Sequence, residues 1–323
     1  MVRPDSPRMV AFTDGHMAHW LPNTRRLMEL AYSCSRFQAG GPVKRMSDPK
    51  ITRKQILIVI FVPLSILAVC TFLYSVIGQP ALLLPPVLIG IFMAWLLVEN
   101  RHFITAHFGR QKEENRAQYS QVEAMLGLLR ILDPKYPLPA TRGWAASPDM
   151  LREIVMQLNS VTPELVLEAS SGTSTLVIAY ALERLGKGRV IALEHDTVYA
   201  ERTRQLLVLH GLQHRATVVL APLVEHRIDA AQYLWYDISN AGIDIPIDMV
   251  VVDGPPDTIR PMARYPAVPV LHAKFGKSVR VLLDDGGRQD ERATAERWAK
   301  EFKATSTHYL ELEKGAWLLR FDR

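Results

Sequence analysis

Cysteine is scarce in this chain of 323 residues, which contains only Cys34 and Cys70. Two cysteines are too few for a disulfide framework, and they form no Cys-x-x-Cys pair that would bind a metal. Cys34 lies in a segment with the composition of a tail, and Cys70 lies inside an apolar run. This cysteine usage is typical of a protein whose globular part lies in a reducing compartment such as the cytoplasm.

Runs of basic residues interleaved with aromatic residues are also absent. The chain has 38 Lys and Arg residues against 33 Asp and Glu residues, which gives a formal net charge of +5. Many of the basic residues flank apolar blocks and do not form a stripe of their own. The sequence therefore argues against nucleic acid as a partner.

Charged residues are missing from two long stretches between residues 56 and 98. Residues 56–77 form an uncharged run, which as a helix would extend about 33 Å and cross a hydrocarbon core of about 30 Å. After a turn at residues 78–80, residues 81–98 form a second uncharged run. The pattern predicts two transmembrane helices in contact with a lipid bilayer. A buried soluble hairpin and a re-entrant second segment are the alternatives.

Basic residues flank both ends of this hairpin, and the turn carries none. They are Lys44, Arg45, Lys50, Arg53 and Lys54 before it, and Arg101, Arg110 and Lys112 after it. Because Lys and Arg are enriched on the cytoplasmic side of membrane segments, both flanks are expected in the cytoplasm. The prediction is a multi-pass protein of the inner (cytoplasmic) membrane with its globular domain in the cytoplasm.

Changes in composition divide the chain into four parts. They are a mobile tail over residues 1–50, the transmembrane hairpin over 51–103, an amphipathic connector over 104–144 and a globular domain over 145–323. Met46, close before the hairpin, is a candidate for the native start. The connector should contain a helix from about residue 111 to 132, because its apolar residues share one face and three prolines follow.

Strand and helix patterns alternate in the globular domain, which favours a parallel sheet with helices on both faces. The strands are expected at 165–169, 189–195, 216–223, 247–256 and 278–285, the helices at 174–185, 197–212 and 289–303, and a final pair of strands within 308–321. The final pair should be antiparallel, since it folds around the Lys314-Gly315 turn.

Five motifs follow in order along these strands, and the third of them is LAPL at the end of the third strand. LVLEASSGTSTL ends a strand at Glu168 and opens a helix through small residues, and VIALEHD places Glu194 at the tip of the next strand. VVVDGPP ends a strand at Asp253, and VLLDDGGR ends another at Asp284 and Asp285. Together they resemble the class I S-adenosylmethionine-dependent methyltransferases with a GSGTST-type first loop. The resemblance covers residues 145–323 and implies an α/β fold, a Rossmann-like seven-stranded sheet with a C-terminal antiparallel hairpin.

The resemblance implies a cofactor site for S-adenosylmethionine at the ends of the first three strands. Its expected residues are Glu168, Ser170, Gly172, Thr173, Ser174, Glu194, Ala221, Pro222 and Leu223. Glu168 would assist the amino group of the cofactor, Glu194 would accept hydrogen bonds from the ribose hydroxyls, and residues 221–223 would border the adenine. The loop departs from the family pattern, since Ser170 and Ser174 replace glycines and a Cβ at Ser170 limits positive φ.

Catalytic and substrate residues are expected at the later strand ends. Asp253 is the first candidate for a catalytic or substrate-orienting carboxylate. With Asp284 and Asp285 it offers oxygen ligands for a divalent metal, although metal dependence is not favoured, because no supporting ligand pattern follows. Arg264, Tyr265 and Trp235 are the candidates for substrate contact.

The sequence thus predicts a membrane-anchored methyltransferase that uses S-adenosylmethionine. Its expected reaction is O-methylation of a small-molecule, lipid-linked or envelope-related substrate at the cytoplasmic face. The alternative is a non-catalytic membrane scaffold built on a degenerate methyltransferase fold, which the Ser170 substitution keeps open. A Rossmann dehydrogenase is disfavoured because the first loop lacks Gly-x-Gly-x-x-Gly. The pattern leaves the substrate and the oligomeric state open.

Overall fold

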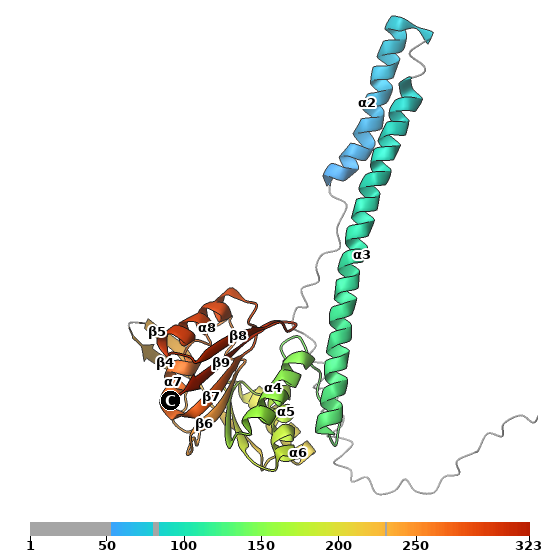
Figure 1. Ribbon diagram of the computed structural model, residues 1–323. Coiled ribbons are helices and arrows are strands. Elements are labelled where there is room, and N and C mark those ends of the chain that lie inside the picture. The colour runs from blue at the N-terminus through green and yellow to red at the C-terminus, as the bar shows by residue number, and fades with distance from the viewer. Residues whose placement is uncertain (1–52, 80–83, 230) are drawn as a thin grey trace, which may run out of the picture. The chain divides into compact units, whose positions relative to one another are not determined.

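The computed structural model describes residues 53–79, 84–229 and 231–323 (Figure 1). The described residues belong to two compact units, a helical unit that ends at Gly127 and a globular domain that begins at Leu128. The tail expected over residues 1–50, the candidate start at Met46 and part of the turn between the two apolar runs lie outside the described residues.

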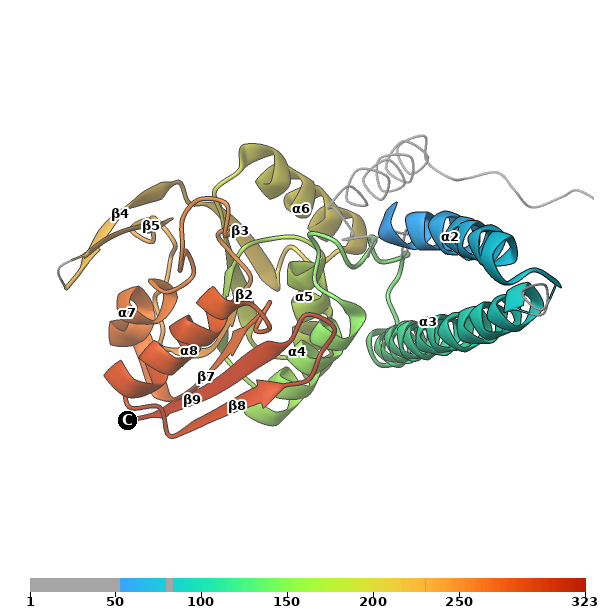
Figure 2. The same cartoon turned by 90° about the horizontal axis from the view of Figure 1, so that it is seen from above.

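The helical unit consists of two apolar helices. Helix α2 spans Arg53–Ile77, and α3 begins at Leu84. They run side by side in both ribbon views (Figures 1 and 2), and Phe61 and Val69 of α2 line a shallow groove together with Leu88 of α3. Two segments, Leu57–Ile77 and Leu84–Arg101, are long and apolar enough to span a membrane.

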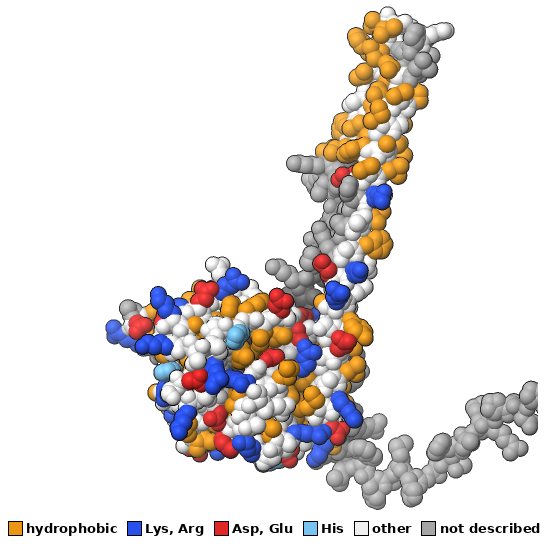
Figure 3. Space-filling view, in the orientation of Figure 1, with side chains coloured by type: hydrophobic (Ala, Val, Ile, Leu, Met, Phe, Trp, Pro, Cys, Tyr) orange, Lys and Arg blue, Asp and Glu red, His pale blue; other side chains and the backbone are white. Residues whose placement is uncertain are grey.

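Apolar side chains cover the outside of these helices (Figure 3). The side chains of Leu67, Phe72 and Leu97 are 61%, 68% and 65% exposed, and only 6% and 0% of the two most apolar windows are buried. The core helix of a soluble protein would bury such residues. The alternative of a buried soluble hairpin therefore has no support in the described packing.

Helix α3 is longer than the sequence suggested. It runs without interruption over Leu84–Leu132, so the second apolar run and the connector helix are parts of one helix of 49 residues. The side chains change from mainly apolar to mainly polar and charged after Val98, but no proline lies between Val98 and Leu132 to interrupt the helix. A boundary at residue 104 is therefore not marked by any break in the backbone.

The globular domain is built around a seven-stranded sheet. The strands are β1 (Leu165–Ala169), β2 (Arg189–Glu194), β3 (Ala216–Leu220), β6 (Ile247–Val252), β7 (Phe275–Leu283), β8 (Ser306–Leu310) and β9 (Ala316–Asp322). Their order is β3-β2-β1-β6-β7-β9-β8, with every contact parallel except those of β9 with β7 and β8. This order confirms the predicted class I methyltransferase sheet and its antiparallel C-terminal hairpin.

Helices cover both faces of the sheet (Figure 2). They are α4 (Pro148–Val161), α5 (Thr173–Leu185), α6 (Thr197–His210), α7 (Ala267–Leu271) and α8 (Gln289–Glu301), with a short 3-10 helix, η2, at His272–Lys274. Neighbouring residues of β1 point into different cores: Val166 packs in a cluster with α4 and α5, and Leu167 packs in a cluster with α7 and α8. Strands buried on both faces are continuously apolar, which explains the runs in the sequence.

A separate hairpin lies between β3 and β6, and the sequence did not predict it. Strands β4 (Leu223–Ile228) and β5 (Ala231–Tyr236) pair antiparallel in a two-stranded sheet of their own. The third strand, expected to reach residue 223, ends at Leu220. In the hairpin, Tyr233 and Trp235 of β5 are buried in the domain core.

Candidate active site at the carboxyl ends of the strands

Four acidic residues meet at the carboxyl-terminal edge of the parallel strands. Glu168 lies next to last in β1, Glu194 ends β2, and Asp253 and Asp284 each follow the last residue of β6 and β7. The strands hold them in register: the Asp253 amide donates to the Ala169 carbonyl at 3.1 Å. The Asp284 amide donates to the Val252 carbonyl at 3.0 Å. Ligands of open α/β sheets bind at this edge.

The loop after β1 turns sharply into α5. Ser170 has φ +136° and Gly172 has φ +149°, in a region that favours glycine. The Ser170 amide donates to the Leu193 carbonyl at 3.1 Å, and the Gly172 amide donates to Thr175 Oγ1 at 3.0 Å. The chain therefore adopts the conformation of a glycine-rich loop although Ser170 carries a Cβ.

Glu168 is fully buried behind this loop. Its Oε2 accepts a hydrogen bond of 2.7 Å from Thr175 Oγ1, and its Oε1 has no partner among the described residues. Burial raises the pKa of Glu168 to about 7, although hydrogen bonds from Ser174 and Thr175 oppose the rise. A buried carboxylate oxygen without a partner is costly and suits a ligand that brings a donor.

Glu194 is held from two sides. Its Oε2 accepts from Ser171 Oγ at 3.0 Å, and its Oε1 accepts from the Asp196 amide at 3.0 Å and lies 3.2 Å from His195 Nδ1. The bond to Glu194 raises the pKa of His195. Asp196 caps α6, since its Oδ1 accepts from the Val198 amide at 2.7 Å.

The remaining predicted cofactor residues lie beside these two acids. Thr173 and Ser174 are buried in the first turn of α5. Ala221 is buried and donates its amide to the Glu194 carbonyl at 2.7 Å, whereas Pro222 is exposed and Leu223 begins β4. The structure thus brings the residues expected at the first three strand ends to one edge.

Asp253 lies in a second cluster with Arg264. Arg264 Nη2 is 3.2 Å from Asp253 Oδ1 and 2.8 Å from Asp285 Oδ2, and Nη1 donates to the Asp284 carbonyl at 2.9 Å. Burial and the neighbouring Asp284 raise the pKa of Asp253 well above its usual value. Burial and Asp285 raise the pKa of Asp284 to about 6. The Asp253 side chain remains 13% exposed and so reaches the surface of the cluster.

The three residues expected to contact substrate are all buried. Arg264 is 5% exposed, and Trp235 and Tyr265 are fully buried in the core. The Tyr265 hydroxyl donates to Glu301 Oε2 at 2.5 Å, and the Trp298 indole donates to the Tyr265 carbonyl at 2.7 Å. These hydrogen bonds hold Tyr265 within the protein, and a role of the three residues in substrate recognition stays a prediction.

Sequence reasoning missed two residues of this edge. Ser171 joins the loop to Glu194, and Glu291 in α8 lies 3.8 Å from Arg264 Nε. Ser171 was recognisable from its place inside the loop motif, whereas Glu291 comes close only through the tertiary fold. Tyr236, next to the candidate Trp235, is buried with its ring 6.0 Å from that of His195.

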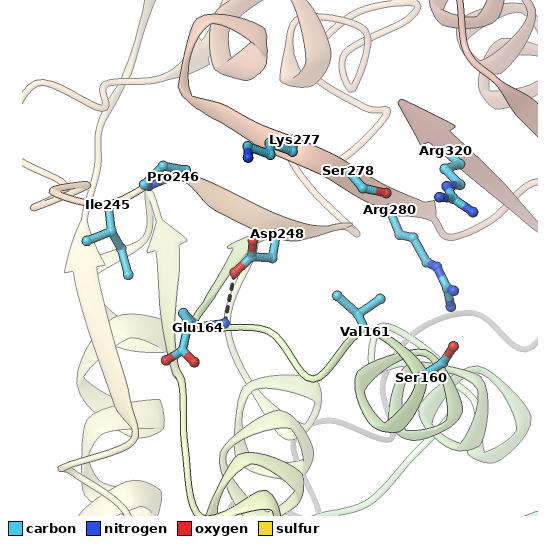
Figure 4. Close-up of a pocket in the computed structure, with 11 residues that line it drawn as sticks. Ser160, Val161, Glu164, Ile245, Pro246, Asp248, Lys277, Ser278, Arg280 and Arg320 are labelled. Carbon is cyan, nitrogen blue, oxygen red and sulfur yellow. Dashed lines mark hydrogen bonds between the residues drawn. The ribbon is translucent and has the colours of Figure 1, made fainter. Parts of the chain in front are cut away.

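A cavity of about 710 Å³ lies at the opposite edge of the sheet (Figure 4). Its walls come from the start of β1, β6 and β7 and the end of α4, and they include Lys277, Arg280 and Arg320. Most of its charged groups are already paired: Asp248 Oδ2 accepts from the Glu164 amide at 2.8 Å, and Arg280 donates to Gln157 at 2.5 Å. The cavity is therefore not part of the candidate active site.

Comparison with a known family decides the class of the domain. Residues 169–286 match the family described as a methyltransferase domain. This domain is a methyltransferase domain. The match begins at the end of β1 and extends past Asp285, so it contains the loop, Glu194 and the Asp253–Arg264 cluster. It confirms the class I S-adenosylmethionine-dependent methyltransferase recognised in the sequence, and with it an enzyme.

Solved structures resemble the methyltransferase domain at low identity. An S-adenosylhomocysteine-bound methyltransferase from Podospora anserina is 12% identical, over 66% of this chain and 96% of that one, with a TM-score of 0.46. The O-methyltransferase TomG from Streptomyces achromogenes is 18% identical, over 62% and 88%, with a TM-score of 0.42. An O-methyltransferase from Bacillus cereus is 16% identical, over 65% and 97%, with a TM-score of 0.41. None of the curated proteins matches the chain.

Proposed function

We propose that the chain is a membrane-anchored O-methyltransferase that transfers a methyl group from S-adenosylmethionine to a small-molecule or lipid-linked substrate at the cytoplasmic face. One observation carries the proposal: Glu168, Glu194 and Asp253 lie together at the carboxyl ends of three neighbouring strands, around a loop with the conformation of a glycine-rich turn. That arrangement supplies two acids for a cofactor and one for a reacting hydroxyl.

The residues at the first two strand ends suit the cofactor. Glu168 Oε1 is a buried acceptor without a partner among the described residues, which suits an ammonium group. A Cβ added at Gly172 would meet nothing within 4 Å, so open space lies beside the loop. Glu194 already accepts from Ser171, but a carboxylate has spare lone pairs for ribose hydroxyls. When bound, the cofactor supplies an electrophilic methyl group on a sulfonium.

Asp253 is the chain's candidate for the proton acceptor. A hydroxyl nucleophile gains reactivity when a nearby base takes its proton, and the best base has a pKa near the working pH. The pKa of Asp253 is raised by burial and by Asp284, in the direction that this role requires. Its partial exposure lets a substrate reach it. The preference for an oxygen nucleophile rests on this carboxylate.

The proposed anchor rests on the exposed apolar surface of α2 and α3. An apolar surface of this extent has no counterpart on an ordinary soluble monomer, and a bilayer would cover it. Lys and Arg on both flanks of the hairpin favour a cytoplasmic location for the methyltransferase domain. A substrate at or near that membrane face follows from this topology.

Calorimetric titration of S-adenosylhomocysteine into the detergent-solubilised full chain tests the cofactor proposal. We expect micromolar binding, weakened about 10-fold to 100-fold in Glu194→Ala through loss of charged hydrogen bonds. Glu311→Ala, a change at an exposed acid on the turn after β8, is the matched control and should bind like the wild type. Absence of binding to a folded wild-type chain would favour a non-catalytic scaffold.

Membrane fractionation tests the anchor. We expect the chain to stay in the membrane pellet after a carbonate wash and to become soluble when residues 1–110 are deleted. The deleted form should still bind S-adenosylhomocysteine if it folds, but it should methylate membrane-derived acceptors poorly. Equal turnover of both forms on a soluble metabolite would contradict a membrane-bound substrate.

A further inference from the structure

Three carboxylates converge at the ends of β6 and β7 in the geometry of a cation site. One oxygen each from Asp253, Asp284 and Asp285 lies within 4.8 Å of the others. Oxygen donors at such spacing are what Mg²⁺, Mn²⁺ and Ca²⁺ prefer. Like charges this close repel one another, so the folded cluster needs a positive charge.

The chain supplies that charge itself. Arg264 inserts its guanidinium among the acids, with Nη2 3.2 Å from Asp253 Oδ1 and 2.8 Å from Asp285 Oδ2. The same nitrogen lies 3.2 Å from the Asp253 carbonyl, and Nη1 lies 2.9 Å from the Asp284 carbonyl. A planar guanidinium with several donors can meet four oxygens at once, which a lysine ammonium does less well.

Two other cations form ion pairs with Asp285 of this cluster. Arg288 Nη1 is 3.2 Å from Asp285 Oδ2, and Lys314 Nζ is 3.9 Å from Asp285 Oδ1. Within the described residues, the ion pair recorded for Asp253 is with Arg264. The position of the candidate base therefore depends on this arginine.

The loop that carries Arg264 is held on both sides of it. The Met262 amide donates to Asp290 Oδ2 at 3.0 Å, and the Tyr265 carbonyl accepts a hydrogen bond of 2.7 Å from the Trp298 indole. Arg297 lies 3.8 Å from the centre of the Tyr265 ring. These contacts with α8 fix the arginine at the strand ends and leave it little freedom to withdraw.

We propose that Arg264 is a built-in cation that takes the place of a divalent metal at Asp253, Asp284 and Asp285, and that it positions Asp253 for methyl transfer without a metal ion. The positioning of Asp253 for methyl transfer rests on the proposed function, whereas the replacement of a metal by Arg264 does not. Arg264 is a positioning residue here, since it acts through Asp253. Arg264, which the sequence suggested for substrate contact, thus acts from a buried position.

Binding of Mn²⁺ to the full chain in detergent tests the inference, with free Mn²⁺ followed by electron paramagnetic resonance. Arg264→Ala should bind Mn²⁺ at least about 10-fold more tightly than the wild type, because it uncovers the oxygen donors. The double variant Arg264→Ala/Asp285→Asn should lose this binding. Mn²⁺ should also restore part of the turnover lost in Arg264→Ala, which a merely structural role would not produce.

Two results would overturn the inference. One is Mn²⁺ binding by the wild type that Asp285→Asn abolishes, since the metal would then sit beside the arginine. The other is a folded Arg264→Ala chain with no affinity for Mn²⁺. If Arg264→Ala melts at room temperature, Arg264→Gln, which keeps an amide donor without the charge, carries the same expectation.

A chelator experiment on the wild type needs no variant. Excess EDTA should leave turnover unchanged, and inhibition reversed by Mn²⁺ would count against the inference. Titration of S-adenosylhomocysteine into the same preparation separates the two proposals. A wild type that binds no S-adenosylhomocysteine would overturn the proposed function, while the Mn²⁺ experiment would still decide the role of Arg264.

Discussion

The Ser171 hydroxyl donates a hydrogen bond of 3.0 Å to Glu194 Oε2 and so joins the loop after β1 to the tip of β2. The same hydroxyl lies 3.1 Å from Thr203 Oγ1 in α6. One serine thus ties together a loop, a strand and a helix at the edge where the cofactor is expected. Contacts within the protein therefore help to hold the loop in shape, which lowers the entropy that binding must overcome.

Replacing Ser171 by alanine should loosen this edge. We expect Ser171→Ala to lower the free energy of unfolding by about 1 kcal/mol, the usual contribution of a partly buried hydrogen bond. S-adenosylhomocysteine affinity should fall by about 2-fold to 10-fold, since Glu194 keeps its other partners. Chemical denaturation and calorimetry measure the two effects. Ser160→Ala, at an exposed end of α4, should change neither, and an unchanged Ser171→Ala chain would refute the linking role.

Ser170 adopts a backbone conformation that glycine adopts more easily. Its φ of +136° costs a residue with a Cβ about 1–2 kcal/mol, so Ser170→Gly should raise the thermal midpoint by about 2–8 °C. Cofactor affinity should be kept or increased. Gly172→Ala is the opposite change. An added Cβ would have open space there, but the φ of +149° strains any residue other than glycine, so this variant should have a lower thermal midpoint. A less stable Ser170→Gly would show that the serine is not strained.

Gly254 packs too closely for a side chain. A Cβ at this position would lie 2.4 Å from the Tyr236 hydroxyl and 3.1 Å from the Ala169 carbonyl oxygen. Gly254→Ala should therefore destabilise the domain by about 1–3 kcal/mol. Tyr236→Phe removes the nearest atom, so the double variant should be more stable than the sum of the single effects predicts. Strict additivity in the double-mutant cycle would contradict this contact.

Glu168 should make stability depend on pH. Its pKa rises from an ordinary value of 4.5 to about 7 on folding, so the folded state binds the proton more tightly than the unfolded state. The contribution of Glu168 to the free energy of unfolding is most favourable below pH 4.5. It falls by about 3 kcal/mol in all as the pH rises from 4.5 to 7. Glu168→Gln should remove that loss and be the more stable form at pH 8. Denaturation of both forms between pH 5 and pH 8 measures the difference.

The same residue predicts a pH dependence of binding. If the ammonium group of S-adenosylhomocysteine meets Glu168, the charged carboxylate binds it better, and affinity should increase as the pH rises through 7. Calorimetry at several pH values should show this slope in the wild type and lose it in Glu168→Gln. A slope retained in the variant would place the titrating group elsewhere.

Much of the sheet was predictable because its strands have clear local sequence patterns. The apolar runs ending in Glu168, Glu194 and Asp253 are short, bounded by turn residues and separated by helical patterns. The C-terminal hairpin was predictable from the Lys314-Gly315 turn, and Gly315 has φ +71° in the structure. These local signals, taken in order, fixed the class of the fold.

The β4–β5 hairpin was not predicted, because its local pattern is weaker. Glu225, His226 and Arg227 interrupt the apolar pattern of β4, so this segment of the sequence resembles a polar loop. The alternation of Tyr233 and Trp235 toward the core was the available signal. Turn residues such as Asp229, with φ +52°, marked the bend only in retrospect.

Burial of charge was the other feature that sequence reasoning did not reach. An arginine after a strand is usually solvated or in contact with a ligand, so Arg264 was assigned to substrate. Its partners Asp285 and Glu291 lie more than 20 positions further along the chain, and only the parallel pairing of β6 with β7 brings them together. Long-range charge pairing of this kind has no local periodicity to reveal it.

The acidic cluster also depends on the C-terminal hairpin. The Gly286 amide donates to the Gly315 carbonyl at 2.9 Å, the Gly287 amide donates to the Lys314 carbonyl at 3.0 Å, and β9 pairs along β7. Residues after Asp285 are therefore held in place by the turn between β8 and β9, which lies in a different part of the sequence. A change that loosens this turn would leave the first loop and Glu194 intact but would disturb the carboxylates at the ends of β6 and β7, so damage far from Asp253 in the sequence would reach the candidate active site.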